Sequence, residues 1–74
     1  MRTYAMLGRC YLEDDSYFIE REGACQYNDY IAKLRLYNNT TGDCVKTVNF
    51  DRSFEASLND QYDALFRSIG VVVE

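Results

Sequence analysis

Alternation of apolar and polar residues organises the first part of the chain. Residues 2–12 repeat with a period of two, apolar on both faces at first and more polar on one face later, which predicts a strand. The polar residues 13–16 interrupt this pattern, because short polar side chains bond their own backbone and favour turns. A β-rich stretch then covers residues 17–22. Together these segments predict a hairpin.

The middle of the chain fits two patterns. Ala24, Tyr27, Ile31 and Leu34 have helical spacing, whereas residues 30–37 alternate as a strand does. We favour the strand, because Lys33 and Arg35 then share a polar face. The turn-forming residues 38–43 separate it from another alternating run, residues 44–50. The sequence therefore predicts a second hairpin, with the choice between strand and helix left open for residues 24–34.

A single apolar stripe with helical spacing follows the second hairpin. Its members are Phe54, Leu58, Tyr62, Leu65, Phe66 and Ile69. Asp51 or Ser53 can cap the start of this helix, and Ser57 can cap a shorter one. Gly70 suits the left-handed position past the end, and residues 71–73 can add a short final strand.

These elements predict one α+β domain spanning residues 1–74. Its four antiparallel strands form two hairpins, and the C-terminal amphipathic helix packs on one face of the sheet. The opposite face must meet water or a partner. With seven Tyr and four Phe, the chain has more aromatic surface than one small core hides comfortably.

The charge of the chain argues against direct contact with nucleic acid. Eight basic residues are scattered among twelve acidic ones, and the net charge is -4. Residues 1–26 carry three bases and five acids, residues 27–50 three and two, and residues 51–74 two and five. Binding to a phosphate backbone requires clustered Lys and Arg, which this distribution does not provide. The apolar stretches are too short for a signal peptide or a membrane span, which favours a cytoplasmic protein.

The sequence offers no motif for catalysis, a cofactor or a metal. It contains no His, so the usual Ser-His and Cys-His nucleophile pairs are excluded, and it has no glycine-rich phosphate loop. Cys10, Cys25 and Cys44 lack the spacing and the fourth ligand of a zinc site, and we expect buried free thiols. We therefore expect a protein that is not an enzyme and needs no cofactor.

Acidic residues and tyrosines are the candidate residues for binding a partner. Glu13, Asp14 and Asp15 occupy the predicted turn, with Glu20 and Glu22 on the outward face of the next strand. A second acidic set is Asp51, Glu55, Asp60 and Asp63. Tyrosines near strand ends and turns suit protein interfaces, or equally the rim of the core: Tyr11, Tyr17, Tyr27, Tyr30 and Tyr37. The predicted partner-binding set is Glu13, Asp14, Asp15, Tyr17, Glu20, Glu22, Tyr30 and Tyr37.

The hypothesis that follows is a small acidic module that binds a protein with a basic surface. A basic surface often lines a nucleic-acid channel, so we expect an inhibitor of a nucleic-acid-handling protein complex. The short, acidic, motif-free chain is similar to phage anti-defence proteins, anti-CRISPRs among them, in size and composition alone. The alternative is a self-associating structural or antitoxin-like subunit, a homodimer joined through a sheet edge at residues 4–12 or 71–73.

Overall fold

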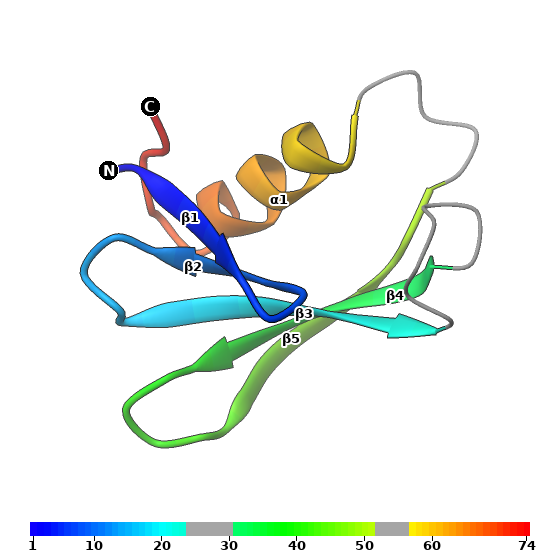
Figure 1. Cartoon of the computed structure of the whole chain (residues 1–74), viewed down its shortest axis with the longest axis horizontal. Coiled ribbons are helices and arrows are strands. Elements are labelled where there is room, and N and C mark those ends of the chain that lie inside the picture. Colours follow the sequence, from blue (N-terminus) through cyan, green and yellow to red (C-terminus); the bar gives the residue numbers. More distant parts are fainter. Residues whose placement is uncertain (24–30, 52–56) are drawn as a thin grey trace.

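Five antiparallel strands and one helix make up the described part of the chain (Figure 1). The structure is a computed structural model that describes residues 1–23, 31–51 and 57–74. The predicted α+β class is confirmed, but the prediction of four strands is wrong. The elements are β1 (Thr3–Met6), β2 (Arg9–Leu12), β3 (Tyr17–Gly23), β4 (Ile31–Asn38), β5 (Cys44–Asn49) and α1 (Leu58–Arg67).

The extra strand arises because the predicted strand 2–12 is itself a hairpin. Leu7 and Gly8 have φ angles of 53° and 75°, and two successive left-handed residues form the tight turn whose twist matches paired strands. A Cβ on Gly8 would also lie 3.2 Å from Nη2 of Arg21. The turn escaped prediction because Leu at its first position is an unusual choice, and Asn-Gly or Asp-Gly is the common signal.

The strands form one sheet in the order of the sequence, from β1 at one edge to β5 at the other. Every neighbouring pair is antiparallel. The predicted turns at residues 13–16 and 38–43 are confirmed, and they connect β2 to β3 and β4 to β5 at the same end of the sheet (Figure 1). The strand prediction is confirmed from Ile31 onward, and residues 24–30 lie outside the described residues.

Helix α1 begins later than residue 54, where the apolar stripe starts. Ser57 is its N-cap: the Ser57 side chain accepts from the Asp60 amide, and the Asp60 carboxylate accepts from the Ser57 amide at 3.1 Å. This reciprocal pair satisfies two amide groups that would otherwise lack partners, so the shorter helix is confirmed. Asp51 does not cap it, and Ser53 lies outside the described residues. Gly70 has a φ of 89°, as predicted for the residue past the helix end.

The core lies between α1 and one face of the sheet. Phe54 of the predicted stripe lies outside the described residues, whereas Tyr62, Leu65 and Phe66 are buried. The buried cluster consists of Cys10, Leu12, Ile19, Ile31, Leu34, Leu36, Tyr62, Leu65, Phe66 and Val73. Cys10 fits the expectation of buried thiols, but that expectation is wrong for Cys44, which is exposed on the edge strand. Cys25 lies outside the described residues.

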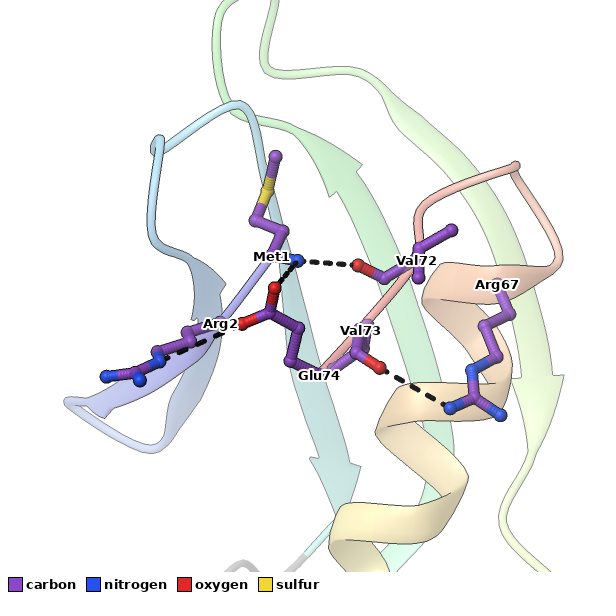
Figure 2. Close-up of polar contacts among 6 residues, drawn as sticks. All are labelled: Met1, Arg2, Arg67, Val72, Val73 and Glu74. Atoms are coloured by element: carbon purple, nitrogen blue, oxygen red, sulfur yellow. Dashed lines mark hydrogen bonds and ion pairs between the residues drawn. The ribbon is translucent and has the colours of Figure 1, made fainter.

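The two ends of the chain meet beside α1 (Figure 2). The Met1 ammonium donates to the Val72 carbonyl at 2.8 Å, and the Glu74 amide donates to the Met1 carbonyl at 2.9 Å. The Glu74 carboxylate lies 3.8 Å from the Met1 ammonium and 3.9 Å from Nε of Arg2. Residues 71–73 are therefore held against the N-terminus without forming the short strand that we predicted.

Candidate functional site: the open sheet face and its acidic end

The sheet face opposite α1 carries a row of aromatic rings across four strands. Tyr4, Tyr11, Phe18 and Tyr37 are successive cross-strand partners on β1, β2, β3 and β4. Neighbouring ring centroids lie 5.3, 5.1 and 5.1 Å apart, and each pair is stacked. These positions alternate along the strands with the core residues, so their side chains occupy the other face. The four residues are called the aromatic row below.

The aromatic row buries its own central members without help from the helix. Tyr11 and Phe18 are only 7% and 9% exposed, although neither belongs to the cluster under α1. The Arg9 guanidinium lies 4.8 Å from the centroid of the Phe18 ring, within cation–π range, and covers it from one side. The row therefore presents mainly its two ends, Tyr4 and Tyr37, to a partner.

Ion pairs occupy the open face next to the aromatic row. Nη2 of Arg9 lies 2.9 Å from the Glu20 carboxylate, and Nη2 of Arg35 lies 2.7 Å from that of Glu22. A hydrogen bond with Tyr11, followed by the Glu20 carboxylate, raises the pKa of Arg9. For Arg35, a hydrogen bond with Tyr37 and then the charge of Glu22 raise the pKa. Glu20 and Glu22 thus face outward, but arginines balance their charges.

The β2–β3 turn holds its carboxylates in a defined arrangement. Oδ1 of Asp14 accepts from the Ser16 amide at 3.0 Å and from the Ser16 hydroxyl at 2.6 Å. These two bonds, the hydroxyl one first, hold the pKa of Asp14 below its usual value, because they stabilise the charged form. Asp14 therefore stays ionised to lower pH than an ordinary exposed aspartate.

Asp15 connects this turn to the aromatic row. It has a φ of 60°, a left-handed conformation that Asp tolerates better than most residues, and its carboxylate accepts from the Tyr4 hydroxyl. That hydrogen bond, then desolvation and the charge of Asp15, raises the pKa of Tyr4 to about 12. The acidic turn and the end of the aromatic row are thus one continuous surface.

The β4–β5 turn lies against the β2–β3 turn and adds a fourth carboxylate. The Asn39 amide donates to the Ser16 carbonyl at 2.9 Å, and Nδ2 of Asn39 donates to the Asp15 carbonyl at 2.9 Å. Asp43 closes the second turn by accepting from the Asn38 amide at 2.9 Å through its carbonyl, which leaves its carboxylate exposed.

We call the four residues Glu13, Asp14, Asp15 and Asp43 the acidic end. All four are exposed, and among the residues that the structure describes none forms an ion pair. The two turns, residues 13–16 and 38–43, contain no Lys or Arg. Arg2 lies beside Glu13, whose amide donates to the Arg2 carbonyl at 2.9 Å, but the Arg2 guanidinium pairs with Glu74. The acidic end therefore carries negative charge without an ion-pairing partner among the described residues, while the neighbouring open face is nearly balanced.

The structure separates the predicted partner-binding residues into groups. Glu13, Asp14 and Asp15 lie together, and Glu20, Glu22 and Tyr37 lie on the open face. Tyr17 faces α1 and packs against the core, so it does not join them. Tyr30 lies outside the described residues.

Sequence reasoning did not find Tyr4, Phe18 or Asp43. Tyr4, Tyr11 and Phe18 recur at intervals of seven residues. Two successive hairpins of that size bring such residues into register, so the spacing was a usable signal once the Leu7-Gly8 turn was known.

The Cys10 thiol is buried in the core. Burial raises the pKa of the Cys10 thiol, which makes it a poor nucleophile. No group of three Cys, Asp or Glu side chains converges as metal ligands would within residues 1–23, 31–51 and 57–74. In the same ranges no helix has the length and apolar content needed to span a bilayer.

Comparison with protein-family models, with curated proteins and with solved structures gives no match to this chain.

Proposed function

We propose that this protein is a non-catalytic binding module that inhibits a nucleic-acid-handling protein complex by occupying its basic surface. The observation that supports this is the acidic end: four exposed carboxylates, gathered by two turns, with no ion-pairing partner among the described residues. The open face of the sheet is a weaker candidate for binding a basic surface, because Glu20 and Glu22 are paired with arginines.

The arrangement of the acidic end favours binding over mere solubility. Hydrogen bonds to Ser16 and Asn39 fix the two turns relative to each other, so few conformations are lost when a partner is bound. Tyr4 lies beside the carboxylates through its bond to Asp15 and is 38% exposed. Tyrosine is enriched in the cores of protein interfaces, whereas their rims are polar, so Tyr4 suits the core of an interface and the carboxylates suit its rim.

Electrostatic attraction explains how such a surface competes with nucleic acid. A concentrated negative potential accelerates association with a basic channel, and the same channel attracts the phosphate backbone. Salt screens the attraction over about 10 Å at 0.1 M, so the complex should weaken as salt increases.

Affinity capture from a bacterial lysate at low and high salt tests the proposal. The tagged protein should retain a nucleic-acid-handling protein at low salt, and an added DNA or RNA oligonucleotide should displace it. Retention of a partner that neither salt nor oligonucleotide affects would refute binding to a nucleic-acid channel.

A matched pair of variants separates local charge from net charge. D14N and D63N each remove one negative charge, from -4 to -3. Only the first alters the acidic end, and Asn at position 14 retains the oxygen that accepts from Ser16. Capture at low salt should fall for D14N and persist for D63N; equal loss in both would show that net charge alone governs retention.

A further inference from the structure

The outer edge of β5 exposes backbone groups that a further strand can bind. β5 is the last strand of the sheet, and its residues are exposed except Val48, which is half-buried. The Phe50 amide donates to the Ala32 carbonyl at 3.0 Å, which identifies that pair as hydrogen-bonded across β4 and β5. Hydrogen-bonded and non-bonded pairs alternate in antiparallel strands, so Thr47 and Asn49 direct their amides and carbonyls away from β4.

A groove lies along this edge on the helix side of the sheet. It runs between β5 and α1 and has a volume of about 280 Å³. Leu34, Val48 and Leu65 form its apolar lining, and its polar lining residues are Lys46, Asp51, Gln61 and Ser68. The groove is open to solvent beside β5, so a side chain of a strand paired with β5 can reach it.

We infer that β5 and this groove form a binding site for an extended peptide segment of a partner protein, which pairs with Thr47 as a sixth antiparallel strand. The peptide residue opposite Thr47 directs its side chain to the open face. Its two neighbours direct theirs to the helix side, because side chains alternate along a strand. The neighbour opposite Val48 enters the apolar groove, and the neighbour opposite Lys46 meets that ammonium group.

Charge at the groove determines the sequence that such a peptide should have. Lys46 forms no ion pair with any residue that the structure describes. Asp51 also lines the groove, but it lies past the end of β5, so a carboxylate at the position beside Lys46 is complementary to Lys46. In an antiparallel peptide the residue opposite Val48 precedes the one opposite Lys46 by two positions. The site therefore favours an aliphatic residue followed, two residues later, by Asp or Glu. This site is distinct from the acidic end and does not depend on the function proposed above.

The same edge could instead pair with β5 of a second copy. In an antiparallel pair centred on Thr47, each Lys46 would lie opposite Val48 of the other copy, without a carboxylate beside it. Charge complementarity at the groove thus favours a foreign acidic peptide over a second copy, and the oligomeric state is part of the test.

The direct test is titration of the full-length ¹⁵N-labelled protein with the blocked peptide Thr-Thr-Leu-Thr-Glu-Thr-Thr, followed by NMR. The amides of Thr47 and Asn49 should shift, and their exchange with water should slow about tenfold when free peptide reaches nine times its Kd. The control peptide carries an N-methyl group on the Thr between Leu and Glu, which removes one donor and should bind at least tenfold more weakly. Equal binding of both peptides, or no shift up to about 1 mM peptide, would overturn the site.

Protein variants test the edge and the charge separately. T47P removes an outward amide and no bond to β4, so it should abolish binding, whereas T47A retains the amide and should bind. K46E should prefer Lys over Glu in the peptide, while K33E, on the opposite face, should keep the original preference. An unchanged preference in K46E would overturn the charge argument. Self-association in sedimentation that T47P abolishes would assign the edge to a second copy and refute the peptide site.

Discussion

Two of the described non-glycine residues have left-handed conformations, and both lie in turns of the sheet. Leu7 is the first residue of the turn between β1 and β2, and Asp15 lies in the turn between β2 and β3. Asp tolerates this conformation, whereas Leu does so at a cost of about 1–2 kcal/mol because its Cβ approaches the following carbonyl. Leu7 is also 88% exposed, so no packing offsets the strain.

Replacing Leu7 by Asn should stabilise the fold. Asn is favoured at the first position of this turn, and the change should raise the free energy of unfolding by about 1 kcal/mol. Urea denaturation measures this, with M6N as the control, since Met6 is an exposed strand residue without a positive φ. A lower stability for L7N than for wild type would contradict the assignment of the turn.

The contact between Tyr4 and Asp15 should be visible in the titration of the tyrosine. The Asp15 carboxylate accepts from the hydroxyl and raises the pKa of Tyr4 to about 12. In D15N the acceptor remains but the charge is lost, so the pKa should fall toward the usual value of about 10. Ring-carbon NMR of Tyr4 across the alkaline range measures the shift.

The sign of the effect on stability follows from the raised pKa. The folded state holds the phenolic proton more tightly than the unfolded chain, so the contribution of this contact is complete below about pH 10. It is lost as the pH rises through about 12. Wild type should therefore lose more stability than D15N over this interval; equal losses would show that the contact does not persist in solution.

At the scale of elements, α1 shows that local sequence patterns predict the buried face of a helix better than its first residue. The apolar stripe predicted the buried face of α1 correctly for Tyr62, Leu65 and Phe66. The start of the helix depended on a choice between caps, and Ser57 with Asp60 completes a reciprocal pair that the predicted stripe could not reveal.

Removal of the cap should destabilise the protein measurably. S57A removes the acceptor of the Asp60 amide and should lower the free energy of unfolding by about 1 kcal/mol. N59A is a suitable control, because Asn59 is exposed on the same helix and is not the cap. Thermal and urea unfolding of both variants give the comparison, and a neutral S57A would mean that the helix start is held by other contacts.

For the whole molecule, the sequence predicted the class of fold more fully than it predicted which residues lie together on the surface. Alternation and turn residues identified the turns at 13–16 and 38–43, since both depend on local chemistry. The Leu7-Gly8 turn was missed because the strand pattern continues through it. Without that turn, the register that aligns the aromatic row could not be predicted.

The candidate surface could be predicted only in part. Glu13, Asp14 and Asp15 are adjacent in the chain, so their proximity required no tertiary information. Asp43 belongs to the other turn, and only the bonds from Asn39 to the β2–β3 turn link the two turns, which the sequence could not show. Glu20 and Glu22 looked equally acidic in the sequence, but cross-strand neighbours supply the arginines that pair with them.

The central claim is that the acidic end drives association with a basic partner. The most direct measurement is the association rate constant, at low and high salt, of wild type and of E13Q/D14N/D15N/D43N with the captured partner. We predict that the variant associates at least about tenfold more slowly at low salt, with a small change in dissociation and a smaller difference at high salt. An association rate equal to that of wild type at low salt would contradict the claim.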